Sequence, residues 1–290
     1  MSASAACPLC GDRCPRVYQL AAAVHRCAHC RLDFAPDVAF DFSRSGRIDE
    51  AKRRESLRPL RMANFAKILD HLLPRVDAAL PGLEVGSGYG WFQEAARLRG
   101  LEVLGVEPDA EVARFARDAD FEVIDGFFSK DLLRGREGRY GFVAFNDVLE
   151  HLPDLPDVLA TCSMALADDG VLVVNLPLRG GIFYRLAAVL HRLGMHGPLT
   201  RLWQFGFASP HLVYFSRDGV RRLLASHGFT LVDYVPLETI RADGLETRIG
   251  FDREADPGTR ALARAMRSAL PILNRCPEDI GCFFATKTRV

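Results

Sequence analysis

The sequence lacks an excess of either charge. Lys and Arg together number 37, and Asp and Glu also number 37, so the formal net charge is zero. Proteins that bind nucleic acids or anionic membranes usually carry a basic excess. The charge balance therefore disfavours a nucleic-acid substrate.

Long apolar runs are also absent, since no uninterrupted apolar stretch reaches the roughly 18 residues of a membrane span. The opening residues, MSASAACPLC, do not combine a basic start with an apolar run as a secretory leader does. No repeat or low-complexity tract is present. We therefore expect a soluble, cytoplasmic protein without a membrane span. Its 290 residues, 49% of them hydrophobic, suffice for a sizeable core in one large or two modest domains.

Four of the eight cysteines form two Cys-x-x-Cys pairs near the N-terminus. Sixteen residues separate Cys7 and Cys10 from Cys27 and Cys30. This spacing allows four thiolates to bind one zinc ion tetrahedrally, and Gly11 suits the tight turn after the first pair. The nearby residues of suitable chemistry are interpreted as packing or surface groups: Cys14, His25 and His29.

Residues 16–20 and 23–26 alternate as two strands of a small ribbon would. A ribbon of this size buries too little apolar surface to be stable alone, so the metal would supply its stability. We expect the zinc to be structural.

Residues 83–108, LEVGSGYGWFQEAARLRGLEVLGVEP, carry the most informative pattern. A short apolar strand leads into glycines at 86, 88 and 90, a helical pattern covers 91–99, and a second strand over 101–106 leads into Glu107. Glycines at this spacing let the backbone turn tightly and approach a ligand, and the helix N-terminus presents free N–H groups. Glu107 is placed to accept hydrogen bonds from a ribose diol. The pattern predicts a nucleoside-binding βαβ unit.

The dinucleotide fingerprint G-x-G-x-x-G does not fit, because position 91 is Trp and the third glycine falls one place early. Glu84 also suits a ligand with an amino group better than a diphosphate, because like charges repel. Residues 84–90 instead resemble the first motif of class I S-adenosylmethionine-dependent methyltransferases, an acidic residue, one residue, then G-x-G-x-G. The resemblance implies that S-adenosylmethionine is bound by Glu84, Gly86, Ser87, Gly88, Gly90, Glu107 and Pro108.

Three later segments extend the resemblance. An apolar strand over 141–145 precedes Asn146-Asp147-Val148-Leu149-Glu150-His151, which is similar to the family's fourth-strand motif. The resemblance adds Asn146 and Asp147 to the cofactor site, with Asn146 near the methionine or sulfonium end. It also places Asp125, at the end of a short strand over 121–124, facing the adenine amino group. The block 211–218 is similar to the segment before the family's sixth strand.

Strands that alternate with helices predict a parallel sheet covered on both faces. Further elements are expected as helices at 155–166, 182–193, 219–227 and 259–270, and strands at 171–176, 229–235 and, antiparallel, 281–287. A helical pattern over 48–73 is expected to break at Pro59. The predicted fold class is α/β, a Rossmann-like seven-stranded methyltransferase sheet with a small N-terminal zinc ribbon. The predicted domains are the ribbon at 1–36, a connector and helical linker or lid at 37–75, and the methyltransferase domain at 76–290 with an insertion at 180–215.

The function indicated is methyl transfer to a small-molecule or glycan-type acceptor at oxygen, with the acceptor enclosed by residues 180–215 and 48–73. For a hydroxyl acceptor, His151 is the preferred general base and His211 the second candidate; the alternative is that His151 only orients the next helix. No Asn-Pro-Pro-Tyr type tetrad follows the fourth strand, which argues against methylation of base amino groups. RNA methylation, with the ribbon on the RNA, and a non-catalytic cofactor-binding scaffold remain alternatives.

Overall fold

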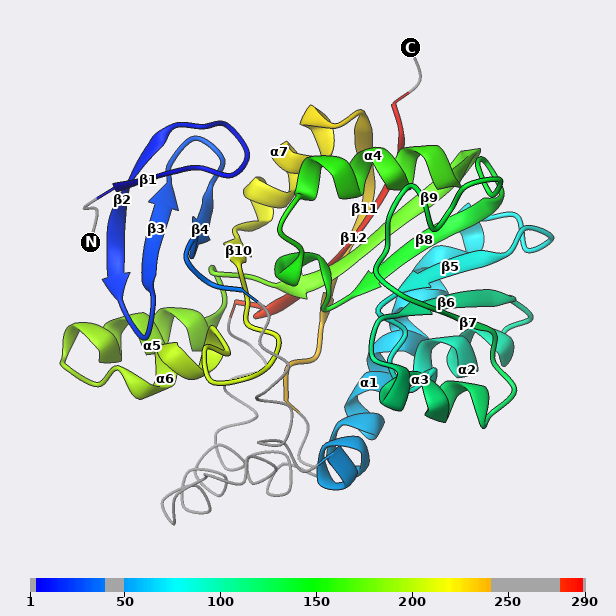
Figure 1. The fold of residues 1–290 in the computed structure, drawn as a ribbon, viewed down its shortest axis with the longest axis horizontal. Coiled ribbons are helices and arrows are strands. Elements are labelled where there is room, and N and C mark those ends of the chain that lie inside the picture. The colour runs from blue at the N-terminus through cyan, green and yellow to red at the C-terminus, as the bar shows by residue number, and fades with distance from the viewer. Residues whose placement is uncertain (1–3, 40–49, 241–276, 289–290) are drawn as a thin grey trace. The chain divides into compact units, whose positions relative to one another are not determined.

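The fold is described from a computed structural model, which covers residues 4–39, 50–240 and 277–288 (Figure 1). The chain forms two compact units. Unit 1 consists of residues 1–61, 177–217 and 237–280, and unit 2 of residues 62–176, 218–236 and 281–290. Within the described ranges, no helix combines the length and the apolar character needed to cross a bilayer.

Unit 2 contains a seven-stranded sheet with the strand order β11-β12-β9-β8-β5-β6-β7. Four neighbouring pairs in this sheet, β5 with β6, β5 with β8, β6 with β7 and β8 with β9, are parallel. The strands are β5 (Gly82–Val85), β6 (Val103–Glu107), β7 (Val123–Asp125), β8 (Tyr140–Asn146), β9 (Leu166–Pro177), β11 (Phe229–Leu237) and β12 (Ile280–Lys287). This order and the parallel pairing confirm the predicted Rossmann-like, seven-stranded sheet.

The central strands are apolar along both faces because helices cover the sheet on both sides. In β8, every residue from Tyr140 to Phe145 is buried. Figure 1 shows α4 and α7 across the sheet from α1, α2 and α3. The helices are α2 (Trp91–Arg97), α3 (Ala110–Arg117), α4 (Leu155–Ala165) and α7 (Arg217–Ser226), with a 3-10 turn, η3 (Leu149–His151). Strand β9 ends in the apolar run that was predicted but begins five residues earlier.

Helix α1 (Glu50–Leu72) runs through Pro59 without a break, so the predicted division into two helices is wrong. Proline lacks only its own N–H, and the chain loses one backbone hydrogen bond at that point while the turns on either side continue. Four apolar residues in the second half of the helix, Phe65, Ile68, Leu69 and Leu72, are buried and anchor it to the core.

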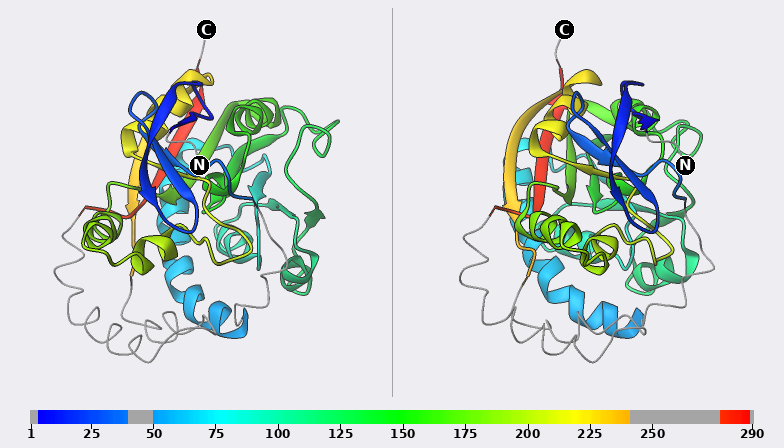
Figure 2. Two further views of the ribbon diagram at one scale, coloured as in Figure 1. Left: turned by 60° about the vertical axis from the view of Figure 1, so that its left-hand side comes forward. Right: turned by 90° about the vertical axis from the view of Figure 1, so that its left-hand side faces the viewer.

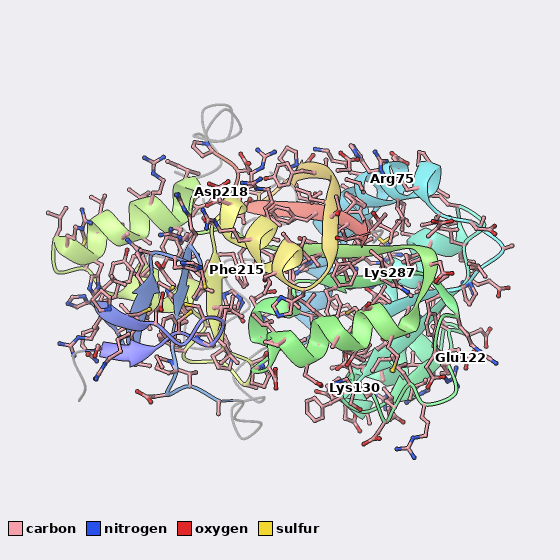
Figure 3. The ribbon with its side chains drawn as sticks, turned by 90° about the horizontal axis from the view of Figure 1, so that it is seen from above. Arg75, Glu122, Lys130, Phe215, Asp218 and Lys287 are labelled. Atoms are coloured by element: carbon pink, nitrogen blue, oxygen red, sulfur yellow. The ribbon has the colours of Figure 1, made fainter. Side chains whose placement is uncertain are left out.

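A 3-10 turn, η2 (Leu73–Arg75), follows α1 and is tied to β11. The carboxylate of Asp233 lies 2.7 Å from His71 Nδ1 and 2.9 Å from Arg75 Nη2. Across the sheet, Lys287 Nζ donates to the Leu166 carbonyl at 2.7 Å; Figure 3 labels Arg75 and Lys287. Polar contacts therefore join the end of α1 to β11, and β12 to β9.

Unit 1 contains a second, five-stranded sheet with the order β1-β2-β3-β4-β10 (Figure 2). Its strands are β1 (Ser4–Ala6), β2 (Arg13–Gln19), β3 (Ala23–Cys27), β4 (Leu32–Phe34) and β10 (Val213–Phe215). The pairs β1–β2, β2–β3, β3–β4 and β4–β10 are all antiparallel. The segment after Cys30 thus contains a strand, β4, that pairs with a strand about 180 residues later in the chain.

The helices of unit 1 pack on this sheet through one apolar cluster. Helix α5 (Ile182–Arg192) contributes Tyr184 and Ala187, and α6 (Gly197–Leu202) contributes Leu199. The sheet contributes Tyr18, Val24 and Tyr214. Residues of the predicted insertion thus complete the core beside the cysteine-rich strands. The helix expected at 259–270 lies outside the described residues.

The N-terminus of α5 is capped by a side chain distant in sequence. The Asp279 Oδ1 atom accepts the Phe183 amide at 2.8 Å. A Cβ at Gly181 would lie 2.3 Å from this oxygen, so only glycine admits the cap. Burial raises the pKa of Asp279 to about 6, although amides of the first turn of α5 lower it.

Candidate functional site

The glycine loop follows β5 directly and leads into α2. Gly86, Gly88 and Gly90 have positive φ angles of 71°, 54° and 76°, a region that other residues rarely adopt. A Cβ at Gly86 would meet Val148 Cγ2 at 2.5 Å, and one at Gly90 would meet Ala116 Cβ at 2.8 Å. A Cβ at Gly88 would meet nothing within 4 Å beyond its chain neighbours. The outer glycines therefore permit close packing, whereas the middle one borders open space.

Glu107 ends β6 and is held against this loop. Its Oε2 atom accepts the Gly88 amide at 2.9 Å, and its Oε1 atom accepts the Asp109 amide at 3.0 Å. The residue is only 9% exposed. The two amide bonds fix the orientation of the carboxylate, so a ligand with hydroxyl donors meets an acceptor that is already positioned.

Strand register brings five polar side chains to one face of the sheet near the carboxyl ends of the strands. Glu84 is opposite Gly105 and Ala144, Glu107 is opposite Asp125, and Asn146 is opposite Asn175. Side chains alternate along a strand, and paired residues point to the same face. The set that shares this face is Glu84, Glu107, Asp125, Asn146 and Asn175. In agreement, Asn146 Nδ2 donates to Glu84 Oε1 at 2.9 Å.

The remaining predicted cofactor residues occupy this edge with different exposure. Asp147 has a positive φ of 56°, and its amide donates to the Asn175 carbonyl at 2.9 Å. Pro108 is exposed after Glu107. The side chain of Asp125 is 60% exposed and forms an ion pair with Arg117. Among the five polar side chains that share this face of the sheet, that of Asp125 is therefore the most exposed to solvent.

Three buried polar atoms at this edge have no hydrogen-bond partner within the described part of the chain. They are Ser87 Oγ, Asn146 Oδ1 and Asn175 Oδ1. A buried polar group without a partner costs about 1–3 kcal/mol, which a polar ligand would recover. Asn175 was missed at the sequence level, although it interrupts the apolar end of a strand just as Asn146 does.

His151 lies at the end of η3, beyond β8. Its side chain is 11% exposed, and its Nε2 atom lies 3.9 Å from Oε1 of Glu150, whose side chain is 1% exposed. The His151 amide donates to the Val148 carbonyl at 2.9 Å, which closes the turn. A buried imidazole beside a carboxylate has the composition of a general base, and the turn sets its position after the strand.

His211 belongs to unit 1, whereas His151 belongs to unit 2. His211 is 5% exposed, its Nε2 atom lies 2.9 Å from Gln204 Nε2, and its amide donates to the Trp203 carbonyl. Its ring lies 5.0 Å from that of Tyr214. Within unit 1, therefore, His211 is a buried, hydrogen-bonded member of an aromatic cluster.

The four predicted zinc ligands come together in unit 1. The Sγ atoms of Cys7, Cys10, Cys27 and Cys30 all lie within 4.8 Å of one another, and Cys10 and Cys27 are 3.7 Å apart. Tetrahedral zinc with Zn–S bonds of about 2.3 Å requires sulfur separations of roughly 3.8 Å. Each pair is followed by a residue with positive φ, Gly11 at 76° and Arg31 at 58°.

The electrostatics of the thiols also suit a bound cation. Burial raises the pKa of Cys10 to about 11 and, more strongly, that of Cys30. Burial opposes ionisation of Cys27 too, but hydrogen bonds from the Cys30 amide and neighbouring thiols lower its pKa. Four thiolates therefore require a divalent cation among them, and the donor set fits zinc.

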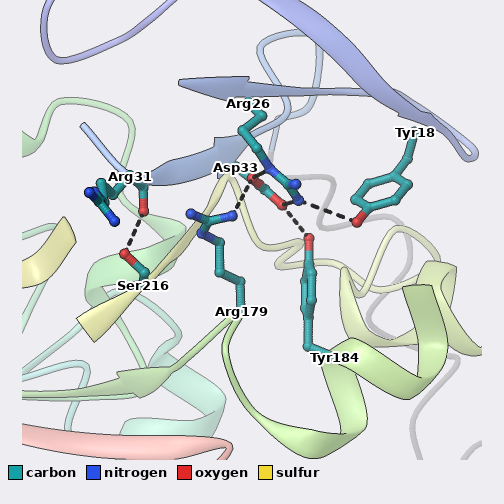
Figure 4. A network of polar contacts seen from close by, with 7 residues as sticks. All are labelled: Tyr18, Arg26, Arg31, Asp33, Arg179, Tyr184 and Ser216. Atoms are coloured by element: carbon teal, nitrogen blue, oxygen red, sulfur yellow. Dashed lines mark hydrogen bonds and ion pairs between the residues drawn. The ribbon is translucent and has the colours of Figure 1, made fainter. Parts of the chain in front are cut away.

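A buried carboxylate, Asp33, joins the strands of unit 1 to α5 (Figure 4). Asp33 is fully buried, and it accepts two bonds from Arg26, at 2.6 and 2.7 Å, and one from the Tyr184 hydroxyl at 2.8 Å. Arg179 Nη1 lies 3.6 Å away. Asp33 raises the pKa of Arg26, and burial together with Asp33 raises that of Tyr184. No sequence motif indicated this network.

The sequence profile of a family described as a methyltransferase domain matches residues 52–234. Among curated proteins, C-methyltransferase NovU of Streptomyces niveus is 27% identical over 203 residues, 68% of this chain and 43% of that protein. Ubiquinone biosynthesis O-methyltransferase of Xanthomonas campestris pv. campestris is 29% identical over 143 residues, 46% of this chain and 57% of that protein. The chain thus spans about half the length of these relatives.

Solved structures share the fold at lower identity. A geranyl diphosphate methyltransferase in complex with S-adenosylmethionine has a TM-score of 0.55 at 20% identity, covering 86% of this chain and 96% of that one. A methyltransferase from Archaeoglobus fulgidus has a TM-score of 0.52 at 17% identity, covering 80% and 97%. The Rossmann-like architecture is confirmed by these likenesses. The roles of the individual site residues stay predictions.

Proposed function

This chain belongs to the methyltransferase-domain family, and we propose that it transfers a methyl group from S-adenosylmethionine to a small-molecule acceptor. The observation that carries this proposal is the convergence on one sheet edge of open space at Gly88, the fixed Glu107 carboxylate and the Glu84–Asn146 pair. These groups fit a ligand that combines a ribose diol, an adenine and a cationic amino acid.

Each part of the cofactor has a proposed partner. Glu107 accepts the two ribose hydroxyls, and the backbone at Gly88 lies against the ligand where a side chain would intrude. Asp125 faces the adenine amino group, and Asn146 and Asp147 line the methionine end. Ser87, within the glycine loop, and Pro108, directly after Glu107, complete the proposed cofactor site. The bound cofactor supplies an electrophilic methyl group on a sulfonium centre.

The main contribution of the chain is to position the acceptor atom in line with that methyl group, since proximity and orientation can supply much of the rate. An acceptor that bears a proton must also lose it. We assign that task to His151, whose Nε2 atom lies 3.9 Å from Glu150 Oε1, so that the negative charge of Glu150 favours the imidazolium formed on proton transfer. His211 is the second candidate.

The acceptor is proposed to be a small molecule, of glycan type or a related metabolite, methylated at oxygen. The named relatives include both an O-methyltransferase and a C-methyltransferase, so carbon is the second candidate atom. Loss of a proton accompanies methylation at either atom, and the base assignment serves both.

One zinc ion is proposed on Cys7, Cys10, Cys27 and Cys30. The four ligands are all cysteine, which leaves no open coordination position for chemistry. Its proposed role is to stabilise the strands of unit 1, whose small sheet shares its core with α5 and α6.

The proposed function is tested by incubating the full-length protein with methyl-labelled S-adenosylmethionine and separate pools of metabolites, sugar nucleotides and RNA. We expect label in a metabolite or sugar pool. Label in RNA, with RNA binding that collapses between low and moderate salt, would instead establish the nucleic-acid alternative. Cofactor binding without methyl transfer to any pool would favour the scaffold.

A further inference from the structure

Asn175 is a buried polar residue within the apolar second half of β9. It follows Val171–Val174 in β9, precedes Leu176, and is only 1% exposed. Its Oδ1 atom has no hydrogen-bond partner among the residues that the structure describes. An apolar residue at this position would avoid the desolvation cost, so the carboxamide requires an explanation beyond packing.

The register of β8 and β9 places this carboxamide next to that of Asn146. The two residues are paired and point to the face that carries Glu84. Neighbouring strands lie about 4.8 Å apart, and the Asp147 amide bound to the Asn175 carbonyl holds the two strand ends together. The side chains of Asn146 and Asn175 therefore form an adjacent pair at the strand ends.

The orientation of Asn146 is fixed by its neighbour. A carboxylate only accepts hydrogen bonds, so Asn146 must present Nδ2 to Glu84, which it does at 2.9 Å. Its Oδ1 atom consequently points away from Glu84, and this oxygen also has no partner within the described ranges. The pair thus offers two acceptor oxygens beside a carboxylate.

The two carboxamide oxygens favour a ligand that donates hydrogen bonds. A carboxamide oxygen can only accept hydrogen bonds. Two such oxygens on adjacent strands are bridged best by one nitrogen atom that carries several hydrogens and lies about 2.8–3.0 Å from each oxygen. An alkylammonium has three donors and a positive charge that the nearby carboxylate favours. A hydroxyl has one donor and serves one oxygen only.

We propose that the Asn146 and Asn175 carboxamide oxygens together bind the α-ammonium group of the amino acid portion of the cofactor. This inference rests on the proposed function, and it adds Asn175 as a binding residue that recognises the ammonium group.

Calorimetry on the full-length protein tests this assignment without an acceptor. The probes are S-adenosylhomocysteine and its deamino analogue, which lacks only the α-amino group. Asn175→Leu removes the oxygen at similar volume, and Asn175→Asp keeps an oxygen there and adds negative charge. Fluorescence of Trp91 and near-ultraviolet circular dichroism report whether each variant is folded.

We expect Asn175→Leu to weaken S-adenosylhomocysteine binding by roughly ten- to a hundredfold, as for loss of a charge-assisted hydrogen bond, while binding of the deamino analogue stays within about threefold. Asn175→Asp should raise the preference for S-adenosylhomocysteine over the analogue. This second variant decides the question if the leucine variant does not fold.

Three results separate failure of this inference from failure of the proposed function. If the wild-type protein binds neither probe, the proposed function fails. If the wild type binds both probes but Asn175→Leu loses equal affinity for each, or loses none, the ammonium assignment is overturned. An unchanged preference in Asn175→Asp overturns it as well.

Discussion

Glu107 allows the cofactor proposal to be tested quantitatively. Its carboxylate is fixed by the Gly88 and Asp109 amides and is 9% exposed, so it loses little entropy when a ligand binds. A hydrogen bond to a charged group contributes about 1.5–3 kcal/mol. We therefore expect Glu107→Ala to weaken S-adenosylhomocysteine binding by roughly ten- to a hundredfold.

Glu107→Ala has a second effect, on the order of the glycine loop, which a single affinity measurement cannot separate from loss of the ribose contact. Removing the carboxylate also leaves the two loop amides without this acceptor, which loosens the glycine loop for any ligand. A double-mutant cycle separates the two effects, with the ligand as the second variable. Isothermal titration of wild type and Glu107→Ala with S-adenosylhomocysteine and with its 2′,3′-dideoxy analogue yields the coupling between Glu107 and the diol.

The expected coupling is about 1.5–3 kcal/mol, the size of a charge-assisted hydrogen bond. Loss of loop order should weaken both ligands to the same extent and cancels in the cycle. A coupling near zero, with both ligands weakened equally, would show that Glu107 organises the loop and does not contact the ribose.

Four further predictions concern the metal, the carboxyl groups of Asp33 and Asp279, and the base. Metal analysis of the wild-type protein should find one equivalent of zinc, which Cys27→Ser should lose and Cys14→Ser should retain; zinc retained in Cys27→Ser would refute the ligand set. Asp33→Asn should destabilise unit 1 by about 1.5–3 kcal/mol, because it removes the charge that Arg26 pairs with, although the Arg26 side chain is 34% exposed and partly solvated, as measured by urea unfolding with Trp203 fluorescence in a Trp91→Phe background; an unchanged midpoint would contradict this. Folding raises the pKa of Asp279 from 3.8 to about 6, mainly by burial, so protonated Asp279 stabilises the fold below pH 3.8 and this stabilisation is lost as pH rises through about 6. Between pH 3.8 and 7, the free energy of unfolding of the wild type should fall by on the order of 2–3 kcal/mol relative to that of Asp279→Asn. Parallel plots of unfolding free energy against pH for the two proteins would disprove the shift. His151→Ala should bind the cofactor normally but turn over roughly 10²–10⁴-fold more slowly, with a deficit that shrinks as pH rises, and near-wild-type turnover from pH 6 to 9 would leave positioning as the mechanism.

Several parts of the fold and site could be predicted because their signals are local. The run from Leu83 to Glu107 contains a buried strand, a glycine turn, a helix and a second strand within 25 residues, and the structure has β5, α2 and β6 there. Likewise, the spacing of Cys7, Cys10, Cys27 and Cys30 requires only two turns and a hairpin to bring the thiols together.

Other features depended on contacts that no local pattern specifies. The pairing of β4 with β10 joins residues about 180 positions apart, and its register depends on which strand edge is available after the rest has folded. At Pro59 a local signal was overridden by tertiary packing. The proline lacks one backbone N–H donor, but the buried apolar face of α1 keeps the helix continuous.

The sequence by itself determined the class of the protein, because glycines at 86, 88 and 90 and a carboxylate after the next strand are requirements of backbone geometry and hydrogen bonding at one short βαβ unit. Only the tertiary structure decided which polar side chains share a face. Asn146 and Asn175 are 29 residues apart and become neighbours through the register of two parallel strands. The partners of Asp33 likewise come from β3, α5 and the loop after β9, and a buried charge acquires its meaning only when those elements pack around it.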